Sequence, residues 1–397
     1  MAQFTPAVGY HHFHDEVNMN FQLNRPLSFG GGKIDEIRSA ANRIRGLSDW
    51  KREFLSLAET AERDGRRGDA AVYLRLAEFF MSVGDTDKQK VYEKFVDLFH
   101  KNLASEYSRG EIIRDKVRYE SGYLPVMRLP VINGKKKGVL VAHGGFDSFI
   151  EELYPLMNYF REHGYEVIAF EGPGQGACLR NYGLVMTPEW ERPVGAVLDH
   201  YGLSDVTLMG ISLGGYLAPR AAAFDKRIKR VVAYDVIYDF FGCIASVRGP
   251  AFEAVIRILV ALRAAPLINA VVRARMRRDP FVSWGVNQGM HVYGVRTPYR
   301  YFREVMRYNT RAFSRRVTQD FLLMAGTRDH FIPLEMFFKQ ARALTNVRSL
   351  TCRLFTEAES AQSHCQVGNI ELALSCIVSW MDEIRNGKRE RSSSSSE

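Results

Sequence analysis

The stretch VTLMGISLGG at residues 206–215 decides the predicted fold of this chain. Its first five residues favour a β-strand, and the helix-forming run YLAPRAAAF follows directly. Between them lies the pattern Gly210-x-Ser212-x-Gly214, in which glycines let a strand, a sharp turn and a helix pack closely without a Cβ clash. A serine on such a turn projects its hydroxyl into open space near the positive end of the helix. The stretch predicts a nucleophilic serine, although the five-residue pattern alone is common.

Strand and helix signals alternate around this turn, which indicates an α/β fold with a mostly parallel sheet. The alternation covers residues 111–240 and resumes over residues 316–387, and we expect both parts to form one core. A pair of strands around Gly122 is expected to form a hairpin at the sheet edge. Apolar strand runs occupy residues 138–145, 206–210, 227–237, 320–326 and 349–355.

Two helical regions lie outside this alternation. Residues 1–110 are predicted to form a helical N-terminal domain, after an irregular leader that ends in the glycines at 30–32. Residues 241–315 are helical and apolar or basic, and we expect them to form a cap inserted between strands of the core. A helix on a membrane surface is the alternative interpretation of this segment. The low-complexity tail at residues 388–397 is expected to be disordered.

The composition excludes several classes of protein. With 397 residues, of which 46% are hydrophobic, the chain is long enough for two cores. Five cysteines without CxxC spacing predict neither a disulfide framework nor a metal site. The N-terminus has no apolar core of a signal peptide, and no run of 18 apolar residues predicts a membrane span. We therefore expect a cytoplasmic protein.

The net charge of +9 comes from dispersed basic residues, with a local cluster RARMRR at residues 273–278. No nucleic-acid motif accompanies this charge, so a solvated surface is expected and nucleic-acid binding is not. An acidic partner that meets the cluster is a third interpretation. The glycine-rich FEGPGQG stretch lacks the Lys-Ser/Thr ending of a phosphate loop, and the dinucleotide spacing GxGxxG is absent. We expect no cofactor.

A nucleophilic serine needs a base, and the base needs a carboxylate that orients it. Asp329 follows the strand run at 320–326, and His364 follows the run at 349–355, so both are expected in loops at the same sheet edge as Ser212. The order Ser, acid, His is that of α/β-hydrolases. Because order and placement agree, we predict Ser212, Asp329 and His364 as a catalytic triad.

The negative charge that develops on an attacked carbonyl needs two fixed N–H donors. We expect one from the backbone of Leu213, directly after the serine. The second is expected from the HGGF loop at residues 143–146, where Phe146 is the first choice and Gly145 the second.

Further residues are candidates for the substrate site. Asp235, at the end of the strand after the serine helix, is also the second choice for the acid of the triad. His330, next to Asp329, is expected to be structural or to line the site. The candidates for contact with the substrate are Asp235, Asp239, Trp284, His291 and Tyr293.

Several stretches together resemble one group of α/β-hydrolases, which includes the pseudooxynicotine-type carbon–carbon hydrolases and fungal polyketide-pathway hydrolases of the fusarin and cytochalasan type. They are HGGFDSFIEE (143–152), FEGPGQG (170–176), GISLGG (210–215), GTRDHFIP (326–333), SHCQVGN (363–369) and, in the cap, WGVNQGMHVYGVRTP (284–298). The resemblance covers nearly the whole chain. It implies the α/β-hydrolase fold, places the group's triad on Ser212, Asp329 and His364, and suggests a homodimer.

These observations predict a serine hydrolase that acts on a carbonyl of a medium-sized, largely apolar secondary metabolite of the polyketide type. The triad is compatible with cleavage of an ester, a thioester or a carbon–carbon bond, and with cyclisation where the substrate supplies the acceptor. Delivery of the substrate by an acyl-carrier domain, which meets the basic cluster, is a further hypothesis. A general carboxylesterase or acylpeptidase is the alternative, and a non-catalytic binding protein on the same scaffold is a third.

Overall fold

The computed structural model describes residues 6–246 and 248–394, with side chains as far as residue 387. An eight-stranded sheet in the order β1-β2-β4-β3-β5-β6-β7-β8 forms its centre. The strands are β1 (Ile113–Tyr119), β2 (Gly122–Leu129), β3 (Gly138–His143), β4 (Tyr165–Phe170), β5 (Val206–Ile211), β6 (Ile228–Tyr234), β7 (Asp320–Gly326) and β8 (Ser349–Phe355). β2 pairs antiparallel with β1 and β4, and the other pairs are parallel. The predicted α/β-hydrolase fold is confirmed.

Helices cover both faces of this sheet. They are α7 (Ile150–Glu162), α8 (Gly176–Tyr182), α9 (Glu191–His200), α10 (Gly214–Phe224), α16 (Glu335–Ala343) and α17 (Ile370–Ser394). Alternate residues of one strand face opposite cores, so Leu208 packs with the helices α9 and α10 while Met209 packs with α7 and α17. All residues of β4 and β5 are buried, as expected for central parallel strands.

The N-terminal helices form a core of their own. They are α1 (Val17–Ser28), α2 (Ile34–Ala41), α3 (Leu47–Arg63), α4 (Arg67–Phe79), α5 (Lys88–Asn102) and α6 (Ala104–Ser108). Trp50, Phe54 and Tyr73 are fully buried between them. The irregular leader that we expected before residue 32 contains helix α1, whose first turn is capped because the Glu16 carboxylate accepts a bond from the Met19 amide at 2.7 Å.

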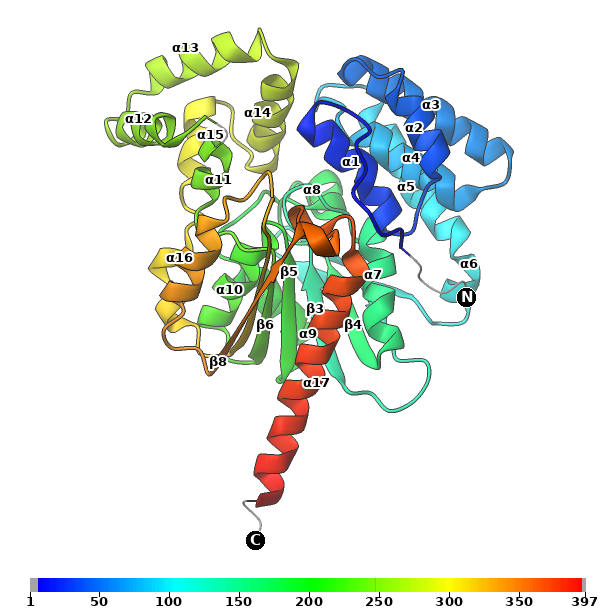
Figure 1. Cartoon of the computed structure of the whole chain (residues 1–397), viewed down its shortest axis with the longest axis vertical. Coiled ribbons are helices and arrows are strands. Elements are labelled where there is room, and N and C mark those ends of the chain that lie inside the picture. The colour runs from blue at the N-terminus through cyan, green and yellow to red at the C-terminus, as the bar shows by residue number, and fades with distance from the viewer. Residues whose placement is uncertain (1–5, 247, 395–397) are drawn as a thin grey trace.

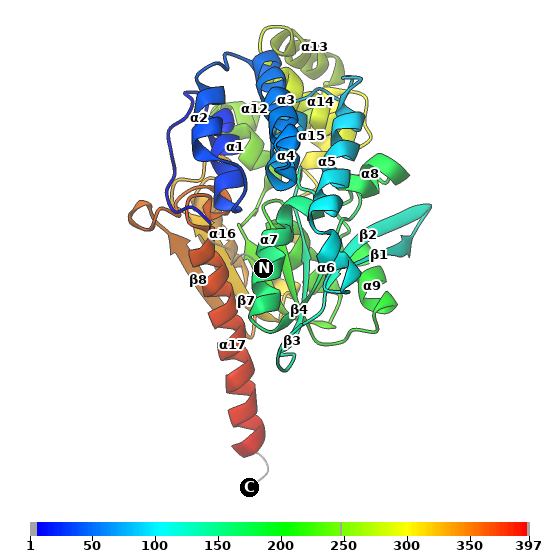
Figure 2. The same ribbon diagram turned by 90° about the vertical axis from the view of Figure 1, so that its right-hand side faces the viewer.

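A second helical group is inserted between β6 and β7. It consists of α11 (Phe240–Ser246), α12 (Pro250–Ala261), α13 (Ala265–Met276), α14 (Pro280–Val292), α15 (Pro298–Val305) and short 3-10 turns at Thr310–Ala312 and Ser314–Arg316. This group and the N-terminal helices both lie over the same end of the sheet (Figures 1 and 2). The helices α12 and α13 and the turn between them expose the apolar side chains Val255, Ile258, Leu262, Leu267 and Val271.

The C-terminal helix α17 extends into the predicted tail. Helix α17 includes residues 388–394 of the tail that we expected to be disordered, and residues 395–397 lie outside the described part of the chain.

Within the described residues, no helix is long and apolar enough to cross a membrane.

Candidate active site

Ser212 lies on the sharp turn between β5 and α10, with a left-handed backbone angle φ of +61°. A residue other than glycine in this left-handed backbone conformation costs about 1–3 kcal/mol, so the surrounding contacts must hold Ser212 in it. The Ser212 amide donates to the Tyr234 carbonyl at 2.6 Å. A Cβ at Gly215 would lie 1.7 Å from the Asp235 carbonyl oxygen, which explains why glycine is needed where the helix approaches β6.

The structure brings Ser212, His364 and Asp329 together from three segments of the chain. Nε2 of His364 lies 2.8 Å from Oγ of Ser212, and Nδ1 lies 2.7 Å from Oδ2 of Asp329. The other oxygen of Asp329 accepts bonds from the amides of Phe331 and Ile332 at 2.7 and 3.0 Å, which fix the carboxylate. The ring can therefore accept the serine proton while its second nitrogen stays bonded to a carboxylate.

Charges around His364 favour its protonated form. Burial alone would lower the pKa of the ring, but Asp329 and the hydrogen bond to Asp235 raise it well above its ordinary value. The carboxylate of Asp235 thus contacts the imidazole directly, with its Oδ2 3.0 Å from Nδ1. Asp235, His364 and Cys365 also place potential ligand atoms within 4.8 Å of one another. Hydrogen bonds already engage Asp235 and His364, and we assign the group to that network rather than to a metal.

The loop after β3 approaches the serine turn closely. A Cβ at Gly145 would lie 2.7 Å from the Leu213 amide nitrogen and 3.0 Å from the Ser212 Cβ. The Gly145 amide donates to Oγ of Ser148 at 3.0 Å, so our second choice for the oxyanion donor is already engaged. Among the described residues, the amides of Phe146 and Leu213 donate to no protein acceptor, and their role as oxyanion donors stays a prediction.

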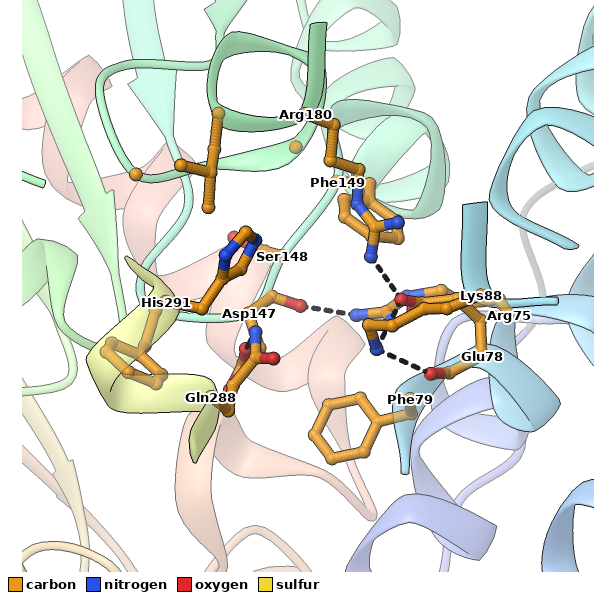
Figure 3. Close-up of a pocket in the computed structure, with 14 residues that line it drawn as sticks. Arg75, Glu78, Phe79, Lys88, Asp147, Ser148, Phe149, Arg180, Gln288 and His291 are labelled. Atoms are coloured by element: carbon orange, nitrogen blue, oxygen red, sulfur yellow. Dashed lines mark hydrogen bonds and ion pairs between the residues drawn. The ribbon is translucent and has the colours of Figure 1, made fainter. Parts of the chain in front are cut away.

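A hollow of about 380 Å³, including its part open to solvent, lies beside this loop between α4, α5, α8 and α14. Figure 3 shows His291 and Gln288 of α14 on one side and the charged residues of α4 and α5 on the other, with Asp147 between them. Nε2 of Gln288 donates to the Asp147 carboxylate at 2.8 Å, and burial raises the pKa of that carboxyl. Burial also lowers the pKa of His291.

Buried ion pairs tie the N-terminal helices to this loop. Glu78 of α4 binds Arg75 at 2.7 Å, Lys88 at 2.8 Å and Arg180 of α8. Burial opposes the charge of Glu78, but its three cations outweigh burial and lower its pKa to about 2. Arg75 also binds Glu152 at 2.7 Å and donates to the Asp147 carbonyl. The network therefore spans the N-terminal helices and the sheet domain.

The remaining candidates for substrate contact have different surroundings. Tyr293 is buried with its ring centre 6.2 Å from that of Phe146. Trp284 packs between helices instead, and its indole nitrogen donates to the Phe79 carbonyl at 3.2 Å. Asp239 binds Arg257 at 2.8 Å, and it also accepts from the side-chain amide of Asn309 and from a backbone amide of α11. We therefore assign the side chain of Asp239 to the structure of the cap.

The sequence interpretation missed the N-terminal residues that reach the histidine. The ring of Phe21 in α1 lies 5.8 Å from that of His364 and 5.0 Å from that of His330. The Gly9 amide donates to the Gly368 carbonyl at 2.7 Å, and Oγ of Ser28 accepts from the Gly368 amide at 2.9 Å. No local pattern marks these contacts.

Residues 139–361 match the alpha/beta hydrolase family, and the chain belongs to this family. Hydrolase acrC of Aspergillus aculeatus is 30% identical over 389 residues, which cover 86% of each chain. Hydrolyase poxO of Penicillium oxalicum is 30% identical over 339 residues, which cover 75% of this chain and 79% of the relative. The predicted resemblance to a group that includes fungal hydrolases is confirmed.

Solved structures share the fold at low sequence identity. AbyA5 has a TM-score of 0.67 at 19% identity, and the match covers 93% of this chain and 95% of AbyA5. The 2,6-dihydroxy-pseudo-oxynicotine hydrolase has a TM-score of 0.63 at 19% identity, with 90% and 94% covered. Both matches cover at least 90% of this chain, so the likeness in fold is not confined to a short segment.

Proposed function

We propose that this chain is a serine hydrolase in which Ser212 attacks a substrate carbonyl, His364 acts as base and acid, and Asp329 orients the histidine. The observation that carries the proposal is the position of the His364 ring, with one nitrogen 2.8 Å from the serine hydroxyl and the other 2.7 Å from the carboxylate. Nucleophile, base and orienting acid thus stand within hydrogen-bond distance in the required sequence.

The reaction proceeds in two halves. His364 takes the hydroxyl proton as Ser212 Oγ bonds to the carbonyl carbon, and the amides of Leu213 and Phe146 bind the oxygen that becomes negative. The protonated ring then gives its proton to the leaving group, which departs as an alcohol, a thiol or, after cleavage of a β-dicarbonyl, a carbon acid. Water, or a hydroxyl of the substrate itself, attacks the acyl-enzyme and releases the acid or a cyclic ester.

We propose an apolar, polyketide-type secondary metabolite as the substrate. Phe146 follows the glycine that touches the serine turn, and its ring centre lies 5.9 Å from that of Phe240 and 6.2 Å from that of Tyr293. An aromatic cluster beside the serine turn suits contact with a largely apolar molecule. The resemblance of residues 143–152 and 170–176 to polyketide-pathway hydrolases supports the same class. A biosynthetic role in the cytoplasm is part of this proposal.

A fluorophosphonate probe tests the reaction, because it forms a covalent bond only with an activated serine. We expect labelling of the wild type and none of Ser212→Ala. Equal labelling of both proteins would show that Ser212 is not the nucleophile, and no labelling of either would favour a binding protein. A panel of p-nitrophenyl esters distinguishes a general esterase, which hydrolyses simple esters fast, from the proposed hydrolase of a specific metabolite. The metabolite that accumulates in producing cells with Ser212→Ala identifies the substrate class.

Two proposals concern partners. The exposed apolar side of α12 and α13 is the surface through which we expect a homodimer, and a mass of one chain in solution contradicts it. The basic residues Arg273, Arg277 and Arg278 are exposed and form no ion pair within the described residues, so they suit an acidic acyl-carrier domain. Charge reversal at these positions is expected to slow turnover of carrier-bound substrate and to leave free substrate unaffected.

A further inference from the structure

Two carboxylates face the same ring nitrogen of His364. Oδ2 of Asp329 lies 2.7 Å from Nδ1, and Oδ2 of Asp235 lies 3.0 Å from it. Their side chains are 2% and 0% exposed, so neither is screened by bulk water. Nδ1 carries a single proton, and a triad needs only one acceptor for it. The second carboxylate is therefore not needed to fix the tautomer.

Asp235 also holds the backbone that carries the histidine. Its Oδ2 accepts from the Cys365 amide at 2.6 Å, and its Oδ1 accepts from the Gln366 side-chain amide at 3.0 Å. Both Cys365 and Gln366 have a left-handed φ of 50°, which residues other than glycine rarely adopt. Each such residue costs about 1–3 kcal/mol and persists only where surrounding contacts enforce it. The Asp235 carboxylate supplies two of those contacts.

The same short segment holds the serine. Asp235 directly follows β6, and the Tyr234 carbonyl accepts the Ser212 amide at 2.6 Å. The Tyr234 hydroxyl donates to the Cys365 carbonyl at 3.2 Å. Residues 234 and 235 therefore connect the turn of the nucleophile with the turn of the base.

We propose that Asp235 is a second positioning acid, which holds the His364 ring toward Ser212 and shares with Asp329 the positive charge that the ring gains from the serine proton. The inference rests on the proposed function and deepens it, because Asp329 is the only acid of the proposed triad.

The charge of the ring depends on all groups that face it. Those that interact with the ring are Asp329 and His330 after β7, Asp235 after β6, Cys243 of α11 and the adjacent Cys365. Tyr10, Arg25 and Tyr234 act on Asp329, Cys365 and Asp235 rather than on the ring itself. Burial lowers the pKa of His330 to about 4 and raises that of Cys365 to about 11, so both are neutral near pH 7. The two aspartates are the anions that bond the ring.

The pH dependence of fluorophosphonate labelling of the full chain tests this role. The low-pH limb reports the pKa of His364, because only the neutral ring accepts the serine proton. Removal of one adjacent negative charge lowers that pKa, so we expect Asp235→Asn to move the limb about one pH unit toward lower pH. We expect Asp329→Asn to lose roughly 10- to 100-fold in labelling rate, since Asp235 remains, whereas a single-acid triad loses about 10⁴-fold.

A matched control is Asp320→Asn, which alters a buried aspartate of β7 that binds Arg348 and Ser349 away from the ring. We expect it to leave the limb in place. An unchanged low-pH limb in folded Asp235→Asn would overturn the inference. A 10⁴-fold loss of labelling rate in Asp329→Asn would also overturn it, and this second result decides even if Asp235→Asn fails to fold. If the wild type is not labelled at all, the proposed function fails instead. Titration of the His364 ring by NMR in wild type and Asp235→Asn then decides the inference independently of activity.

Discussion

The guanidinium of Arg75 donates a hydrogen bond to the backbone carbonyl oxygen of Asp147. Arg75 belongs to α4 in the N-terminal helices, and Asp147 follows Phe146, whose amide we propose as an oxyanion donor. The Arg75 guanidinium carbon also lies 4.2 Å from the ring centre of Phe149 in the same loop. A helix outside the sheet therefore contacts the loop that carries the proposed oxyanion donor, and we expect the N-terminal helices to affect the proposed reaction as well as the stability.

The first prediction concerns Arg75→Lys, which keeps the charge beside Glu78 but cannot maintain the forked contacts of the guanidinium. We expect fluorophosphonate labelling to slow by about 10²-fold, because a loop displaced by an ångström misplaces its donor. Arg66→Lys is the control, since Arg66 pairs with Glu36 and Asp69 among the N-terminal helices. An unchanged labelling rate in Arg75→Lys would show that this contact of the N-terminal helices does not affect the reaction.

The second prediction concerns the buried carboxylate of Glu78. Glu78→Gln leaves Arg75, Lys88 and Arg180 without their shared anion, and we expect a loss of about 3–5 kcal/mol in the free energy of unfolding at pH 7. The folded pKa of about 2 lies below the unfolded value, so this stability is present above about pH 4.5. It is lost as the pH falls toward 2.

Urea unfolding at pH 7, 4 and 3 measures this difference between wild type and Glu78→Gln. We expect the gap to narrow at each step toward acid, because the wild type loses its advantage as Glu78 takes up a proton in the unfolded chain. Glu59→Gln, at an exposed position of α3, is the matched control and is expected to stay within about 0.5 kcal/mol of wild type. A gap that does not change with pH contradicts the assigned charge of Glu78.

The order of strands made much of the site predictable from the sequence. Loops after β5, β7 and β8 meet at the carboxyl edge of a parallel sheet, so residues 212, 329 and 364 had to lie near one another once the strands were recognised. This placement follows from local patterns and chain order alone. It does not depend on any contact between the helical regions and the sheet.

The contacts of the N-terminal helices follow from packing between distant segments, which no local pattern encodes. Phe21 lies in a stretch that we expected to be irregular, and its ring nevertheless reaches His364. A signal was present for the ion network, because Arg75 and Glu78 interrupt the apolar helix AVYLRLAEFF three residues apart. Charges inside an apolar helix indicate buried partners. For Asp235, the sequence suggested an alternative acid, whereas the structure places it on the same nitrogen as Asp329.

The third prediction compares two glycines. A Cβ at Gly215 would lie 1.7 Å from the Asp235 carbonyl oxygen, so Gly215→Ala must push α10 away from β6. We expect destabilisation of about 1–3 kcal/mol or more, together with loss of labelling because the serine turn moves. Gly285 in α14 faces open space, and Gly285→Ala is expected to be neutral or to stabilise by about 0.5–1 kcal/mol. Thermal unfolding of both variants measures the contrast, and equal effects contradict the steric argument.

The fourth prediction separates the backbone of Phe146 from its side chain. Phe146→Ala keeps the amide proposed as an oxyanion donor but removes a ring that lies against Phe240 and Tyr293. We therefore expect kcat for p-nitrophenyl acetate to change by less than about threefold, because the small ester makes little contact with the ring. For p-nitrophenyl octanoate we expect KM to rise about tenfold, which corresponds to roughly 1.4 kcal/mol of lost apolar contact. Phe338→Ala, at an exposed position of α16, is the control for both esters. Equal losses with the two esters would mean that the ring supports the loop rather than lines the substrate site.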